Sequence, residues 1–151
     1  MLKITDFMDR TKVYVAASYP RKADAIKMAS MLEGAGFRIA SKWLEDTSAD
    51  GAYAEDLSPE EVQLQSTKTA EIDFQNVSDS DMLVVITGDT KTRGGRHSEV
   101  GITLAQGKWV FLFGPREQVF HWHPGVHSAH SRYDHLISDM KGCSPRRSDA
   151  Y

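Results

Sequence analysis

The sequence lacks several features that would fix its class at once. Its single cysteine, Cys143, excludes a disulfide within one chain, so we expect a reducing, cytoplasmic environment. Its longest apolar runs, such as residues 109–113, are far too short to cross a bilayer. The first residues also lack the charged-then-apolar pattern of a secretion signal. We therefore predict that no membrane is involved.

A large excess of charge of one sign is absent as well. The 151 residues carry a formal net charge of −3 and a sequence pI of about 6.0. This balance argues against a nucleic-acid polymer as partner but leaves single nucleotides open. With 40% hydrophobic and 26% charged residues and no internal repeat, the composition is that of one globular domain. We expect that domain at 12–140, between a short extension (1–11) and a disordered tail (141–151).

Strand-like and helix-like patterns alternate along the chain. Buried strands are predicted at 13–17, 37–43, 82–87 and 109–113, and helices at 22–35, 58–77 and 95–106. Ser58-Pro59-Glu60-Glu61 has the capping serine and early proline of a helix start. Residues 44–57 are predicted as an acidic loop, and residues 114–135 as a long loop with room for one short strand or helix. Residues expected on buried helix faces are Ile26, Ala29, Leu32, Ala70, Phe74 and Val77.

This alternation predicts an α/β fold: a single-domain, doubly wound parallel sheet of four to five strands, flavodoxin-like or Rossmann-like, with helices on both faces. In such sheets ligands bind beyond the carboxyl ends of the strands. We therefore expect one crevice bordered by Ser18 and Tyr19, the loop at Trp43, residues 88–95 and residues 114–116.

The loop after the third strand carries the strongest chemical signal. Gly94 and Gly95 allow a tight turn and a close approach to a ligand. The helix that follows offers free N–H groups and a positive dipole end, which favour anions. Glu99 is predicted in the first turn of that helix, where the dipole would keep it ionised. An ionised carboxylate there is suited to act as a nucleophile.

Four pieces of sequence occur in a recognisable order. They are a strand with Tyr14 that ends at Ala17-Ser18-Tyr19-Pro20, an acidic helix with Asp73 before Ser78-Asp79-Ser80-Asp81, the segment Ser98-Glu99-Val100-Gly101, and Gly107-Lys108-Trp109-Val110. This ordered set, covering roughly Lys12 to Gly125, resembles the nucleoside 2-deoxyribosyltransferase family, which includes 2′-deoxynucleoside 5′-monophosphate N-glycosidases.

The resemblance implies roles for three residues. Glu99 matches the glutamate that attacks C1′ of the deoxyribose, and Asp73 matches the aspartate that holds the sugar or handles the proton of the base. Tyr14 matches a tyrosine near the active site, although a tyrosine on a core strand is more often packing. No cofactor is expected. Family members commonly oligomerise, with one subunit's chain end completing another's pocket, so we expect a homo-oligomer.

The chain also departs from the family pattern. Transferases often have an aspartate six residues before the nucleophile, where this chain has Arg93. Monophosphate glycosidases tend to bind phosphate through serines and backbone N–H groups of this loop, where this chain has glycines, arginine, histidine and one serine. An anionic substrate is therefore plausible. Its candidate ligands are Gly94, Gly95, Arg96, Ser98 and, after the fourth strand, Arg116, although a loop arginine is normally a solvated charge.

Other candidates have a structural interpretation that is as good or better. Trp43 could stack on a base, but a tryptophan at a strand end is more often part of the core. Five histidines crowd into residues 121–135 without the spacing of an established metal motif, so no metal is predicted. We expect that segment to close over the crevice or to meet a neighbouring subunit. The five are His121, His123, His127, His130 and His135.

The function expected from the resemblance is cleavage or exchange of the N-glycosidic bond of a 2′-deoxynucleoside or its 5′-monophosphate, through a covalent deoxyribosyl intermediate on Glu99. Two alternatives stay open. One is a ribonucleotide or NAD-type glycohydrolase that uses the same glutamate. The other is a non-catalytic module that senses a nucleotide through the Gly-Gly loop.

Overall fold

A parallel sheet forms the centre of the molecule. The computed structural model describes residues 11–45, 57–89 and 94–143. Five strands lie in the order β2-β1-β3-β4-β5, all parallel. Their bounds are β1 Lys12–Ala16, β2 Arg38–Ile39, β3 Met82–Ile86, β4 Trp109–Phe113 and β5 Val126–His130. The predicted α/β fold with a parallel sheet is confirmed.

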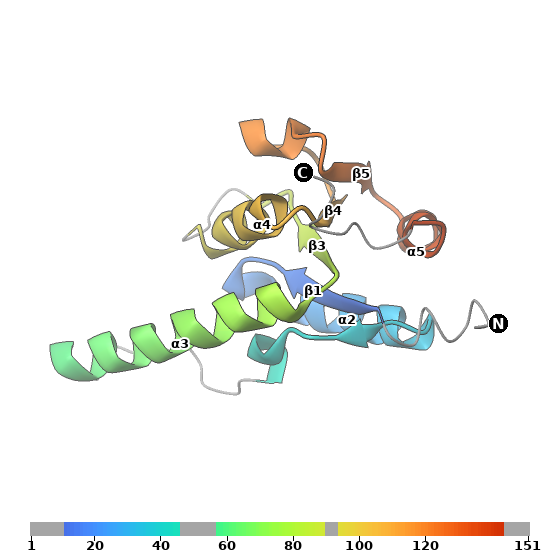
Figure 1. Cartoon of the computed structure of the whole chain (residues 1–151). Helices are drawn as coiled ribbons and strands as arrows, with labels where there is room; N and C mark the ends of the chain where they lie inside the picture. Colours follow the sequence, from blue (N-terminus) through green and yellow to red (C-terminus); the bar gives the residue numbers. More distant parts are fainter. Residues whose placement is uncertain (1–10, 46–56, 90–93, 144–151) are drawn as a thin grey trace.

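Helices cover both faces of this sheet (Figure 1). They are α2 Lys22–Gly34, α3 Pro59–Asp79, α4 Gly95–Ala105 and α5 Tyr133–Lys141, with short 3-10 turns η1 Tyr19–Arg21, η2 Lys42–Glu45 and η4 Val119–Trp122. Residues of α2 and α5 form one core with Val13, Val15 and Val84. Residues of α3 and α4 form the other with Tyr14, Leu83 and Val85. Because successive strand residues face opposite sides, Tyr14 belongs to the face that α3 and α4 cover.

The second strand is much shorter than predicted. Only Arg38 and Ile39 pair with β1, whereas the sequence pattern indicated a strand from residue 37 to residue 43. Side chains then replace the missing backbone partners of Val15. The Ser41 hydroxyl accepts from Val15 N at 2.6 Å, and the Trp43 indole donates to Val15 O at 2.9 Å. A buried backbone can be satisfied in this way without a longer edge strand.

Two helix faces differ from their predictions. The capping box at the start of α3 is present, with Ser58 and Glu61 exchanging hydrogen bonds. Beyond it, however, Asn76 and Val77 are the only residues of α3 that are buried, and Phe74 is 53% exposed. Figure 1 shows the reason: the first half of α3 projects past the sheet. In α2, Ile26 is also exposed, and Ala25 and Met28 join Ala29 and Leu32 in the core.

The end of the chain holds more structure than a loop. The segment predicted as a long loop contains η4, β5 and the start of α5, which buries Leu136 and Met140 against the sheet. Helix α5 extends to Lys141, one residue into the predicted tail. The predicted extension, acidic loop and tail fall partly outside the described residues, at 1–10, 46–56 and 144–151.

Candidate active site

Tyr14, Glu99 and Asp73 come from three different elements and meet on one face of the sheet. Tyr14 is fully buried on β1, and its hydroxyl donates to Oε1 of Glu99 at 2.9 Å. Glu99 projects from α4 and Asp73 from the inward side of α3, where it is half-buried although its neighbour Phe74 is exposed. The Asp73 carboxylate lies close enough to act electrostatically on both of the others. The structure therefore brings together the three residues that the family resemblance singled out.

Glu99 lies one turn further along its helix than predicted. Helix α4 begins at Gly95 after the N-cap Gly94, so Glu99 is its fifth residue, and the first turn contains no acidic residue. The dipole effect is confined to the first turn of a helix. The prediction that the dipole keeps Glu99 ionised is therefore wrong, and burial has the larger influence on this carboxyl group.

Burial is the largest cause of a raised pKa in all three groups. The pKa of Glu99 is raised to about 8. Burial is the main cause, the Tyr14 hydrogen bond acts to lower the pKa, and the negative charge of Asp73 acts to raise it. Burial also raises the pKa of Asp73 to about 6. The pKa of Tyr14 lies far above its ordinary value, first because of burial and then because of Glu99 and Asp73. Tyr14 therefore stays a hydrogen-bond donor, while the two carboxyl groups can hold or release a proton near neutral pH.

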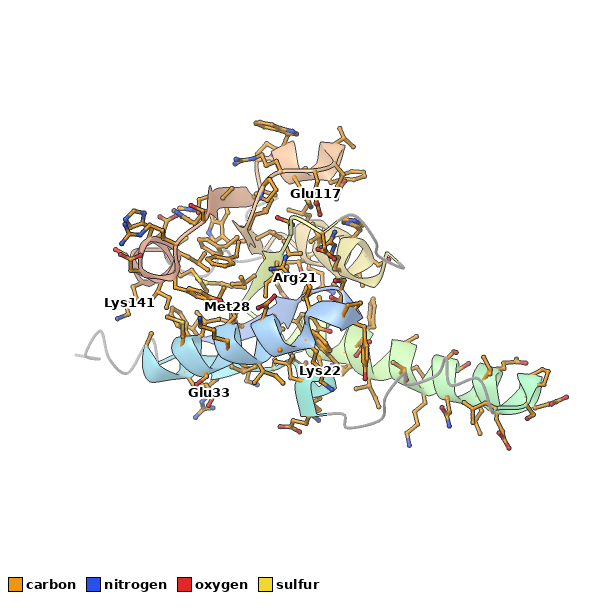
Figure 2. All side chains as sticks on the ribbon, turned by 180° about the vertical axis from the view of Figure 1, so that it is seen from behind. Arg21, Lys22, Met28, Glu33, Glu117 and Lys141 are labelled. Atoms are coloured by element: carbon orange, nitrogen blue, oxygen red, sulfur yellow. The ribbon has the colours of Figure 1, made fainter. Side chains whose placement is uncertain are left out.

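A second group of charged residues surrounds the start of α4. Arg96 is only 3% exposed, and its guanidinium pairs with Asp89 and with Glu117, the latter at 2.6 Å. The hydroxyl of Ser18 donates to Asp89 as well. Figure 2 labels Glu117, which lies close to η4 and the start of α4. Two predicted ligands, Ser18 and Arg96, are thus joined through a carboxylate that the sequence interpretation did not include.

Asp89 and Glu117 are the residues that sequence reasoning missed. Asp89 follows β3 and Glu117 follows β4, both at the carboxyl edge of the sheet where ligand-binding residues gather. That position was a usable signal. Neither residue belongs to a recognised motif, however, and only the fold shows that both face the same guanidinium.

The remaining predicted ligands have varied surroundings. Gly94 has a φ of +91°, a left-handed conformation that suits glycine, and a Cβ added at Gly94 or Gly95 would meet no described atom within 4 Å. Ser98 is exposed on the second turn of α4. Tyr19 is 41% exposed beneath the Lys22 ammonium group.

Trp43 and Arg116 point to structural roles. The indole of Trp43 packs against both cores and donates to Val15 O, in keeping with the core interpretation. Arg116 donates to the carbonyl of His121 at 3.2 Å and lies over the ring of Trp122, 4.8 Å from its centroid. Both side chains therefore have protein partners in the structure.

The five histidines separate into different environments. His121 is the buried residue of η4, His123 accepts from Gly125 N, and His135 is exposed on α5. His127 and His130 both lie near one oxygen of Asp139, at 3.3 Å and 2.9 Å. Within residues 11–45, 57–89 and 94–143, no group of three or more histidine, cysteine, aspartate or glutamate side chains is arranged to hold a metal ion. In the same ranges no helix is both long and apolar enough to span a membrane.

Comparisons with known proteins give likenesses at the level of structure. No family model matches the chain, and no curated protein matches its sequence. Among solved structures, a 2-deoxyribosyltransferase from Bacillus psychrosaccharolyticus superposes with a TM-score of 0.59 at 18% identity, over 91% of this chain and 98% of its own. The present chain has the same fold as that 2-deoxyribosyltransferase. The CMP N-glycosidase BcmB of Clostridium botulinum gives 0.55 at 15% identity, over 88% and 100% of the two chains. A conserved protein from Enterococcus faecalis gives 0.52 at 19% identity, over 87% and 98%.

Proposed function

We propose that this chain belongs among the nucleoside 2-deoxyribosyltransferases and related N-glycosidases, and that it cleaves or exchanges the N-glycosidic bond of a 2′-deoxynucleoside or its 5′-monophosphate. One observation carries the proposal: the 2.9 Å hydrogen bond from Tyr14 to Glu99, with the Asp73 carboxylate beside it. A site that only bound a ligand would not require two carboxyl groups placed close together and shielded from water. The shared fold with a 2-deoxyribosyltransferase and a CMP N-glycosidase supports the same reaction class.

The first step uses the two carboxyl groups in different roles. A carboxylate oxygen of Glu99 attacks C1′ and forms a sugar ester while the bond from C1′ to the base nitrogen breaks. The electron pair of that bond leaves with the base, which takes a proton from Asp73 or from water. Tyr14 holds Glu99 in place and remains a neutral donor throughout.

The second step decides the name of the enzyme. Water or the nitrogen of another base attacks C1′, the ester bond breaks, and Glu99 leaves as a carboxylate. The attacking group gives up its proton to Asp73, or to the hydroxide left when water protonated the base, which restores the starting state. Water gives a hydrolase and a second base gives a transferase.

A single proton shared by the carboxyl pair fits this cycle. Between pH about 6 and about 8 the pair carries roughly one proton, since the pKa of Asp73 is about 6 and that of Glu99 about 8. The reactive arrangement has Glu99 ionised and Asp73 protonated, which is the minor of the two one-proton states because Glu99 has the higher pKa. Its population is greatest between the two values and falls on either side.

A ribonucleotide substrate is the second candidate. One protein with this fold is a CMP N-glycosidase, named for a ribonucleoside monophosphate substrate. The same glutamate chemistry would serve such a substrate. We infer this alternative from that likeness alone, whereas the deoxy substrate follows from the residue pattern as well.

Chromatography of reaction mixtures tests the proposal. The purified protein is incubated with each deoxynucleoside, each deoxynucleoside 5′-monophosphate and the matching ribo compounds, with and without a second free base. Glu99→Ala is the test variant, and Glu33→Ala, at an exposed glutamate of α2, is its matched control. We expect free base or an exchanged product from the wild type and Glu33→Ala, and at least a roughly 10³-fold loss in Glu99→Ala. Ribo compounds turned over in preference would establish the alternative, and no turnover of any compound would overturn the proposal.

We also propose that the chain acts as a homo-oligomer, because α3 exposes three large apolar side chains. Leu64 is 72% exposed, Phe74 53% and Ile72 40%, along a helix that projects from the sheet. A second copy packed against α3 would bury part of this apolar surface. Light scattering after size-exclusion chromatography is expected to give a mass of at least twice 16.9 kDa. Leu64→Lys is expected to lower that mass, and a monomeric wild type would contradict the proposal.

A further inference from the structure

Arg96 occupies an unusual position for a charged side chain. It is the second residue of α4 and lies three residues before Glu99, so the two are about one turn apart on neighbouring positions of the helix surface. Its side chain is 1% exposed. A guanidinium buried this deeply requires partners, because an unpaired charge in the interior is strongly destabilising.

Its partners lie on the loops that follow two neighbouring strands. Nη1 donates to the carbonyl of Ile86, the last residue of β3, at 2.9 Å and to Oδ1 of Asp89. Nη2 donates to Oε1 of Glu117 at 2.6 Å and to the Asp89 carbonyl at 3.3 Å. The first turn of α4 is therefore fixed to the carboxyl ends of β3 and β4.

The same carboxylates extend these connections. Asp89 accepts the hydroxyl of Ser18, which follows β1, and the other oxygen of Glu117 accepts from Gly88 N at 3.2 Å. The backbone N–H of Glu117 donates to Nδ1 of the buried His121 at 3.1 Å. Loops after β1, β3 and β4 thus meet around one guanidinium. We call Arg96, Asp89 and Glu117 the arginine clamp.

The charges of the clamp do not suit a substrate anion. Two carboxylates pair with Arg96, and both of its terminal nitrogens are engaged. The guanidinium of Arg21, 3.8 Å from Asp89, is itself bound to the Thr87 carbonyl and to Asp24. Hydrogen bonds from Ser18 and Arg96, together with the charge of Arg96, hold the pKa of Asp89 below its usual range against the opposing effect of burial. Asp89 therefore stays ionised near neutral pH. A phosphate brought to the Arg96 guanidinium would meet those two negative charges.

We propose that Arg96, held by Asp89 and Glu117, is a positioning residue that sets the place of Glu99 relative to Tyr14. The inference rests on the proposed function, in which Glu99 is the nucleophile. Glu99 is carried by α4, Tyr14 by β1, and the clamp is a polar connection between the start of α4 and the loops beyond the sheet. A displacement of about 1 Å at a reacting group can cost about 10²-fold in rate.

Glu117 is the better residue to change, because it is 24% exposed whereas Arg96 is buried. Glu117→Ala removes the clamp contact, Glu117→Gln keeps an acceptor of the same size, and Glu33→Ala is the matched control on α2. We expect kcat of Glu117→Ala to fall about 10- to 100-fold with KM within about 2-fold. Glu117→Gln is expected to recover part of the loss. A rise in KM for monophosphates with kcat unchanged would instead make Arg96 a ligand and overturn the inference.

A second measurement keeps the clamp testable without turnover. The carboxyl group of Glu99 is titrated by ¹³C NMR in the wild type, Glu117→Ala and Glu33→Ala, with thermal unfolding measured on each. Burial is the largest cause of the raised pKa of Glu99, so a loosened α4 that admits water is expected to lower that pKa from about 8. An unchanged pKa and an unchanged kcat in Glu117→Ala would overturn the inference. A wild type inactive on all substrates would overturn the proposed function instead, while the titration would still decide the clamp.

Discussion

Two clusters of titratable side chains lie on opposite faces of the sheet, and the pKa of the central carboxyl group is shifted in opposite directions in the two clusters. In the first, Glu99 accepts from the Tyr14 hydroxyl, its one donor among the residues that the structure describes, and a second carboxylate, Asp73, lies nearby. In the second, one oxygen of Asp139 on α5 accepts from Ser128 and lies 2.9 Å from His130 and 3.3 Å from His127. The pKa of Glu99 is raised to about 8, whereas that of Asp139 is lowered.

The contrast separates a reactive carboxylate from a structural one. Burial opposes ionisation in both clusters, but Ser128, His130 and His127 overcome it at Asp139. At Glu99 one hydrogen bond does not overcome burial and a neighbouring negative charge. A buried carboxyl group with few hydrogen-bond donors can change its protonation state near neutral pH, and such groups are common at catalytic sites. A carboxylate with several hydrogen-bond donors, such as Asp139, instead connects α5 to β5.

The largest expected difference is obtained by neutralising one aspartate in each cluster. Asp73→Asn is expected to lower kcat/KM by about 10²- to 10⁴-fold, the usual range for a lost general acid. Asp139→Asn is expected to leave kcat/KM within about 2-fold, because it touches no residue of the first cluster. Steady-state rates at pH 7 compare the two. Equal losses in both variants would mean that the clusters do not differ in role.

The pH profile of the same variants sharpens this test. Wild-type kcat/KM is expected to be bell-shaped, with apparent pKa values of about 6 and about 8 that belong to the carboxyl pair. In Asp73→Asn a single ascending limb is expected, because Glu99 alone must still ionise. That limb should lie below pH 8, since the repulsion from Asp73 is gone. A profile with both limbs retained would contradict the assignment.

Tyr14→Phe is expected to have a smaller effect. The hydrogen bond from Tyr14 lowers the pKa of Glu99, so removing it should raise that pKa above about 8. One pKa unit corresponds to a tenfold smaller ionised fraction, and we expect kcat/KM at pH 7 to fall about 10-fold. ¹³C NMR titration of Glu99 and the pH profile should move together. A pKa of Glu99 that falls in Tyr14→Phe would show that the cavity left by the hydroxyl admits water.

The smallest expected effect is on stability, in the second cluster. The pKa of Asp139 is lowered in the folded state, so its contribution is present above the unfolded pKa of about 3.9 and is lost as the pH falls through the folded value. Asp139→Asn is therefore expected to cost about 1 kcal/mol at pH 7 and less at pH 3. Urea unfolding at both pH values measures this. An equal cost at both would mean that packing, rather than charge, is involved.

Much of the framework could be predicted from local sequence. The bounds of β4 match the prediction, α2 and β3 match within one residue, and the capping box of α3 is present as expected. These features depend on neighbouring residues, so a single sequence contains them. The later elements were less clear because β5 and α5 are short and follow a turn-rich segment. Leu136 and Met140, four residues apart, were the available signal for α5.

For the site, the sequence by itself determined which residues were available: a tyrosine on a buried strand, an aspartate on an acidic helix and a glutamate after a Gly-Gly turn. Only the tertiary structure decided that Tyr14 and Glu99, 85 positions apart, share a hydrogen bond. It also decided that Phe74 faces outward next to Asp73, that Trp43 serves the backbone of Val15, and that Arg96 is enclosed by Asp89 and Glu117. The reason is physical. Periodicity reports which face of an element is apolar, whereas pKa values and ion pairs depend on groups that chain folding brings together from distant positions.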